Sequence, residues 1–141
     1  MALDILEYSY PYFFGLGGMR GQAIPAKLLK ECDLIIALGT SFTHAFGGQN
    51  FDQFNRNANL IMVNIDDNEM NKKNLNANLK ISIDLKEFLN EILNNLEKHE
   101  LNLSKDNWLR YSMELKENFK FPALKGNPIN SYYFIECLNK Y

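Results

Sequence analysis

Cysteine is scarce in this sequence of 141 residues, which contains only Cys32 and Cys137. The two lie far apart in the chain, and neither has a second cysteine or a histidine at the spacing of metal ligands. A disulfide scaffold and a structural zinc site are therefore poorly supported. We expect two buried or half-buried thiols in a reducing compartment.

Excess charge of one sign and long apolar runs are also missing. Lysine and arginine number 15 against 17 aspartate and glutamate, a net charge of −2, which argues against a strongly basic nucleic-acid-binding surface. No apolar run approaches the ~18–20 residues of a membrane helix, and the first residues do not follow the pattern of a signal peptide. We expect a cytoplasmic protein that binds neither nucleic acid nor membranes.

Apolar runs that do occur are short and predict the strands of a parallel sheet. Leu34–Leu38 ends at Gly39, and Leu60–Ile65 is broken by Asp66. Runs without alternation are typical of parallel strands that are covered on both faces. A third, shorter strand is predicted over Leu79–Ile83.

Helical patterns precede and follow these strands, and Phe51–Asn57 between the first two is expected to be a loop or a short helical turn. One helix is expected over Gln22–Cys32, with Pro25 in its first turn, where a missing N–H costs nothing. Asp84 is expected to cap the next helix, whose apolar positions 85, 88, 89, 92, 93 and 96 share one face. A linker over Glu100–Asp106 and two further helices follow. The order predicts an α/β fold, a Rossmann-like parallel sheet flanked by helices, with a C-terminal helical extension.

Ligands of such sheets bind beyond the carboxyl ends of the strands. Gly39, Thr40 and Ser41 follow the first strand, Asp66 follows the second and Asp84 follows the third. A glycine admits a ligand close to the backbone, and a carboxylate can accept hydrogen bonds from ribose hydroxyls, so the set fits a nucleotide. The structural alternative is that the glycine ends a strand, Asp66 makes a turn and Asp84 caps a helix.

Other candidate groups carry weaker signals. Glycines at 15, 17, 18 and 21 precede a helix, but their spacing departs from G-x-G-x-x-G, so they suit a tight crossover as well as a phosphate cradle. His44 and His99 have no partner pattern for a catalytic triad, and a surface ion pair suits Arg20 better than a phosphate. We assign no catalytic and no metal-binding residue.

These segments, taken in order, resemble the central domain of thiamine diphosphate-dependent enzymes of the acetolactate synthase type. The resemblance covers residues 3 to about 96. It is carried by Pro11–Gly15 with Gly18 and Gly21, Cys32–Thr40, Asn50–Phe54, Ile61–Asp66 with Glu69 and Lys72, and Ile83–Asp84 with Phe88–Leu89. The later Trp108 and Pro128–Asn130 are similar to the entry into that family's diphosphate-binding domain.

The resemblance implies a domain organisation and a role. Residues 1–100 would be the central domain, expected to be truncated at its N-terminus, and residues 101–141 a linker with the first helices that lead to a diphosphate-binding domain. The intact enzyme would use thiamine diphosphate and Mg²⁺ to decarboxylate a 2-oxo acid such as pyruvate and to join the product to an acceptor. The chain, expected to be a fragment, would be inactive alone and would pack against other domains or subunits in a homo-oligomer.

The resemblance also implies a possible second ligand, because the central domain of some members holds FAD or an adenine nucleotide. Gly39, Thr40, Asp66 and Asp84 would fall at that site. Two alternatives stay open: a sirtuin-like NAD-binding module, similar in Gly39–Ser41 after an apolar strand, and a non-catalytic interaction domain.

Overall fold

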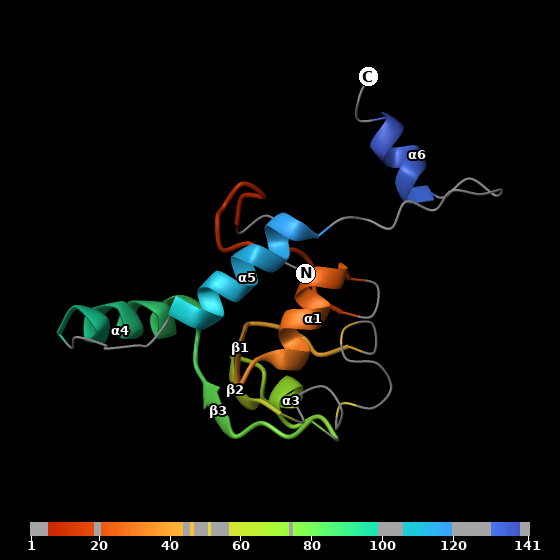
Figure 1. Ribbon diagram of the computed structural model, residues 1–141. Helices are drawn as coiled ribbons and strands as arrows, with labels where there is room; N and C mark the ends of the chain where they lie inside the picture. The colour runs from red at the N-terminus through yellow and green to blue at the C-terminus, as the bar shows by residue number, and fades with distance from the viewer. Residues whose placement is uncertain are drawn as a thin grey trace.

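A computed structural model describes residues 6–18, 21–43, 46, 51, 57–73, 75–98, 106–119 and 131–138 of the chain. Its central part contains three strands with helices before, between and after them (Figure 1). In chain order the elements are α1 (Ala23–Glu31), β1 (Leu34–Leu38), β2 (Asn59–Asn64), α3 (Asp67–Met70), β3 (Leu79–Ser82), α4 (Leu85–Lys98), α5 (Asp106–Asn118) and α6 (Ser131–Leu138).

The strands form one parallel sheet in the order β1-β2-β3. Its register pairs Ile36 with Ile61 and Leu38 with Val63, and then Val63 with Ile81. The two apolar runs are thus neighbours, which confirms the α/β class and the parallel direction. The middle strand begins and ends one residue earlier than predicted, and the short helix α3 was not predicted at all.

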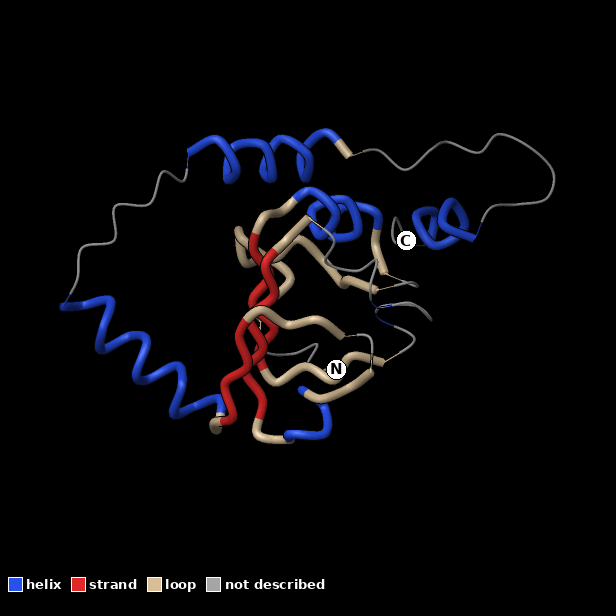
Figure 2. Tube along the Cα trace, turned by 90° about the horizontal axis from the view of Figure 1, so that it is seen from below, coloured by secondary structure: helices blue, strands red, loops and turns tan. Residues whose placement is uncertain are grey.

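One face of the sheet carries the core. Ile35 and Ala37 of β1 and Leu60 and Met62 of β2 point to this face and are buried. They pack in one cluster with Leu29 of α1, with Met70 of α3 and Leu75 beyond it, and with three aromatic side chains from the segment after β1, Phe42, Phe46 and Phe51. Figure 2 shows α1 and α3 on this side of the sheet and α4 on the other.

The opposite face of β1 is open, so the prediction that this strand is covered on both faces is wrong. Leu34, Ile36 and Leu38 expose 46%, 51% and 40% of their surface. Val63 of β2 is buried on the same face, where α4 contacts β2. The described elements cover only the inner face of β1, since α4 leaves the sheet instead of lying across it (Figures 1 and 2).

Helix α4 begins where the sequence predicts, and its apolar stripe is unburied. The helix has no buried residue. Its strongly exposed apolar side chains are Leu89, Ile92, Leu93 and Leu96. Among the residues that the structure describes, every helix is too short or too polar to cross a membrane.

The segment with the glycines closes on itself before α1. The backbone N–H of Gln22 donates to the Leu16 carbonyl at 2.8 Å, and the Leu16 N–H donates to the Gln22 side-chain oxygen at 3.0 Å. A Cβ at Gly21 would overlap the Leu16 carbonyl oxygen. These two bonds and this close approach support a tight crossover into the helix.

Helix α5 packs back on α1 and the N-terminal segment. The Tyr111 hydroxyl donates to Glu31, and the Lys116 ammonium donates to the Pro11 carbonyl at 3.1 Å. The helix expected beyond the linker is therefore in direct contact with the sheet's own helical layer.

Candidate functional site

The first strand ends in the tight bend expected of Gly39. Its φ of +57° lies in the left-handed region that glycine adopts without strain. Its N–H donates to the Val63 carbonyl at 2.8 Å, and the next carbonyl, that of Thr40, accepts from the Asn64 side chain at 3.2 Å. The loop after β1 is thereby bound to the end of β2.

Asn64 connects all the strand ends. Besides its bond to Thr40, its side-chain oxygen accepts from the Asp66 N–H at 3.0 Å, and its carbonyl accepts from the Ile83 N–H at 3.3 Å. The Ser82 hydroxyl donates to Asp67 at 2.9 Å. The predicted groups after the three strands therefore lie at one edge of the sheet.

Both predicted aspartates act as helix caps. The Oδ1 atom of Asp66 accepts from the Asn68 N–H at 2.9 Å, at the start of α3. The Oδ1 atom of Asp84 accepts from the N–H groups of Lys86 and Glu87 at 2.9 and 3.3 Å, at the start of α4. One oxygen of each carboxylate therefore has a structural role as a helix cap, as the alternative to ligand binding predicted. In the described part of the chain, neither Oδ2 atom accepts a hydrogen bond.

A polar cluster that the sequence analysis did not single out as a site holds the same edge. Glu69 accepts from Ser41 at 2.8 Å and from the Lys72 ammonium at 2.5 Å, and Lys72 also donates to the Phe42 carbonyl at 2.9 Å. The pKa of Glu69 is lowered, and the largest cause is the hydrogen bond that the Lys72 ammonium donates to its carboxylate. In the sequence, Glu69 and Lys72 carry part of the family resemblance and stand three positions apart, but no pattern assigns them a role.

The remaining predicted groups divide into two sets. Arg20, His44 and His99 lie outside the described residues. Cys32 and Cys137 are free and half-buried, as expected, and burial raises the pKa of the Cys32 thiol. In the described ranges, no group of three or more His, Cys, Asp or Glu side chains could hold a metal ion.

Comparison with known proteins places the chain in a family. The model of the family "Thiamine pyrophosphate enzyme, central domain" matches residues 1–92. The acetolactate synthase large subunit of Cyanidium caldarium is 34% identical over 116 residues, which is 80% of this chain and 19% of that protein.

Two other relatives match almost the whole chain. The acetolactate synthase isozyme 1 large subunit of Escherichia coli is 29% identical over 139 residues, covering 98% of this chain and 24% of that subunit. The 3D-(3,5/4)-trihydroxycyclohexane-1,2-dione hydrolase of Bacillus cereus is 29% identical over 144 residues, covering 96% and 22%. The chain therefore spans about a quarter of these relatives or less. The family match covers well over half of the chain, and the chain belongs to the thiamine pyrophosphate enzyme central-domain family.

Proposed function

We propose that this chain is a structural, nucleotide-binding part of an acetolactate synthase-like enzyme and contributes no catalytic residue itself. The intact enzyme would decarboxylate a 2-oxo acid such as pyruvate and join the product to an acceptor. The relatives named acetolactate synthase support this reaction class, and the arrangement of the strand ends supports the nucleotide. Residues 1–100 would form the central domain and residues 101–141 the linker with the helices beyond it.

The observation that carries the nucleotide proposal is the pair of half-used carboxylates at one edge. Asp66 and Asp84 are fixed by their capping bonds through Oδ1, so the second oxygen of each is oriented without further cost in side-chain entropy. Such an oxygen can accept from a ribose hydroxyl. Gly39 leaves the backbone accessible, and Thr40 and Ser41 continue the loop beside it. The shared ligand chemistry is the ADP moiety, present both in ADP and in FAD.

Isothermal titration with ADP, FAD and NAD tests this site. In Asp66→Asn and Asp84→Asn, the side-chain oxygen can still cap the helix, but the carboxylate charge is gone. Because a hydrogen bond to a charged group contributes about 1.5–3 kcal/mol, each variant should weaken binding roughly tenfold or more. Glu91→Gln, which removes a charge from an exposed part of α4, is the matched control.

The relative affinities for the three ligands distinguish the proposed functions. FAD binding with weaker ADP binding would identify a flavin site, and equal binding would identify the ADP moiety as sufficient. Binding of NAD alone would favour the sirtuin-like alternative. No binding of any of the three would contradict the nucleotide proposal and favour a non-catalytic interaction domain.

Thiamine diphosphate and Mg²⁺ do not fit the residues present. The family that the sequence resembles holds Mg²⁺ and the diphosphate with a Gly-Asp-Gly motif, which does not occur in this sequence. In the residues that the structure describes, no group of three or more His, Cys, Asp or Glu side chains could hold a metal ion. In this proposal the cofactor and its metal ion are held by other domains or subunits, which are the chain's partners in a homo-oligomer. The neighbouring coding sequence offers a direct test, since it should encode an upstream domain and a downstream Gly-Asp-Gly.

A further inference from the structure

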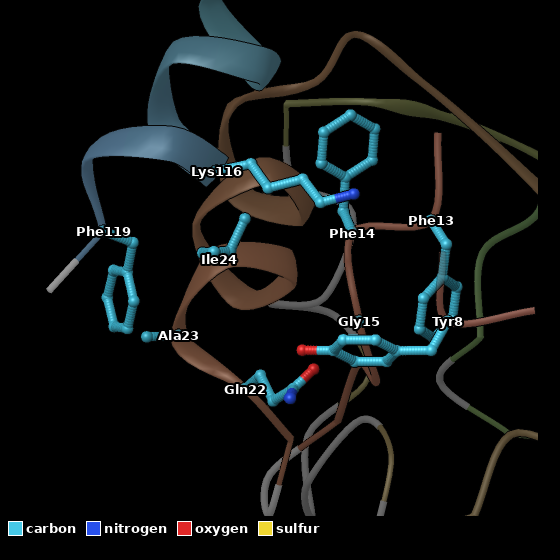
Figure 3. Close-up of a pocket in the computed structure, with 9 residues that line it drawn as sticks. All are labelled: Tyr8, Phe13, Phe14, Gly15, Gln22, Ala23, Ile24, Lys116 and Phe119. Atoms are coloured by element: carbon cyan, nitrogen blue, oxygen red, sulfur yellow. The ribbon is translucent and has the colours of Figure 1, made fainter. Parts of the chain in front are cut away.

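A cavity lies away from the strand ends, among aromatic side chains (Figure 3). Its volume is about 280 Å³. We call it the aromatic pocket; its lining residues include Tyr8, Phe13, Phe14, Gln22, Ile24 and Lys116. None of the groups proposed for the nucleotide site lines it.

Three parts of the chain that are distant in sequence build the aromatic pocket. The N-terminal segment supplies Tyr8, Phe13 and Phe14, the start of α1 supplies Gln22, and α5 supplies Lys116. The bond from Lys116 to the Pro11 carbonyl, at 3.1 Å, fixes α5 against the N-terminal segment. The pocket is thus part of the tertiary packing and not a feature of one loop.

The aromatic rings offer flat apolar walls. Tyr8 and Phe13 meet edge to face, with ring centroids 5.9 Å apart. Tyr8 exposes 80% of its surface, although a large aromatic side chain gains free energy when it is covered. Figure 3 shows the Tyr8 hydroxyl end directed toward Gln22, so the ring lies along one side of the cavity. A flat aromatic guest would cover it.

Lys116 supplies a positive charge at the wall. Its ammonium lies 5.6 Å from the centroid of the Phe14 ring, and Figure 3 shows the side chain extending toward that ring. The Pro11 carbonyl accepts from one of its three N–H donors. In the part of the chain that the structure describes, no carboxylate forms an ion pair with Lys116; the recorded pair joins Lys72 and Glu69.

We propose that the aromatic pocket binds a small aromatic carboxylate, with its ring beside Tyr8 and Phe13 and its carboxylate at Lys116. The size supports a single ring, since about 280 Å³ lies just under the ~300–1,000 Å³ of sites for drug-sized ligands. The charge supports an anion, because a half-buried ammonium next to aromatic walls is less well solvated than one in bulk water. This site is independent of the proposed nucleotide site.

Benzoate is the probe, and benzamide is its neutral match in shape. Saturation-transfer NMR and titration of the amide spectrum of the full chain would measure both. We expect benzoate to bind at least fivefold more tightly than benzamide and to shift amide signals of residues 13–15 and of α5. Raising the salt concentration should weaken benzoate binding and leave benzamide binding unchanged. ADP should not displace benzoate.

Substitutions distinguish the contribution of the Lys116 charge from that of the aromatic walls. Lys116→Gln should abolish the preference for benzoate, Lys116→Arg should retain it, and Lys30→Gln, which removes an exposed lysine from α1, should change nothing. Phe13→Leu should weaken both probes alike while leaving Lys116 in place, which keeps the test valid if Lys116→Gln does not fold. Equal binding of the two probes, no binding of either, or a full benzoate preference in a folded Lys116→Gln would overturn the proposal.

Discussion

The hydroxyl of Tyr111 in α5 donates a hydrogen bond to the carboxylate of Glu31, the last residue of α1. The Lys27 ammonium lies 5.7 Å from the centroid of the same tyrosine ring. Two helices that are far apart in sequence are therefore joined through one side chain, which both accepts a cation on its ring and donates a hydrogen bond.

Replacing Tyr111 by phenylalanine tests this link. Tyr111→Phe removes the hydroxyl and keeps the ring, so the free energy of unfolding should fall by about 0.5–1.5 kcal/mol. Urea denaturation followed by circular dichroism would measure the change. Tyr12→Phe is the control, because Tyr12 is exposed and its ring packs on Tyr10 without such a link. An unchanged midpoint in Tyr111→Phe would show that the two helices are held by packing alone.

Acid should weaken the attachment of the loop after β1. The hydrogen bond from Lys72 holds the pKa of Glu69 below its ordinary value of 4.5. Because the folded state lowers this pKa, the stabilisation is present above pH 4.5 and is lost as the pH falls through the lower, folded value. Both side chains are partly solvated, so we expect at most about 1 kcal/mol.

The matching experiment compares unfolding at pH 6 and pH 3. Glu69→Gln should reduce the difference in stability between the two pH values, whereas Glu91→Gln should leave it as in the unmodified chain. An unaltered difference in Glu69→Gln would mean that the Glu69–Lys72 pair does not contribute to stability in solution.

The start of α4 depends on its cap. Asp84→Ala removes the acceptor of the Lys86 and Glu87 N–H groups and should cost about 0.5–2 kcal/mol, whereas Asp84→Asn should cost less because asparagine also caps helices. Thermal melts of the two variants would measure this. If Asp84→Ala melted with the unmodified chain, the capping bonds would be dispensable.

Catalysis is not expected from the chain alone. We predict no acetolactate in the presence of thiamine diphosphate, Mg²⁺ and pyruvate, since no catalytic residue is assigned in this sequence and it contains no Gly-Asp-Gly to hold the metal ion. A colorimetric assay for acetolactate would detect product. Formation of acetolactate above a reaction without protein would refute the prediction.

The open apolar surfaces should cause self-association. Edge strands and uncovered apolar faces pair with other copies, and both β1 and the α4 stripe are exposed here. Light scattering at increasing concentration should detect oligomers, and Ile92→Lys, which charges the stripe, should reduce them. Asn94→Lys adds the same charge on the opposite side of α4 and should not. A monodisperse monomer at high concentration would contradict this expectation.

Local features of the fold could be predicted from the sequence because short-range rules decide them. The cap at Asp84 follows because aspartate accepts hydrogen bonds from the first N–H groups of a helix. The strand end at Gly39 follows because glycine adopts a positive φ without strain. The outer face of β1 could not be predicted, because an unbroken run such as Leu34–Leu38 shows which side chains favour burial but not which elements are supplied to cover them.

One candidate site could be predicted from the sequence and the other could not. Asp66 and Asp84 could be placed at one edge, because parallel strands end together. Each aspartate caps the helix that begins directly after it. The capping role of Asp66 could not be predicted, because helix α3 was not predicted. The aromatic pocket could not be predicted, because Phe13 and Lys116 are brought together only when α5 packs on α1.

The reciprocal bonds between Leu16 and Gln22 make the entry to α1 a closed ring of chain. Each residue donates to the other, so the backbone and the side chain of Gln22 both hold the segment closed. The two amide hydrogens should consequently exchange with deuterium more slowly than backbone amides without a hydrogen bond, and Gln22→Ala should speed the exchange at Leu16.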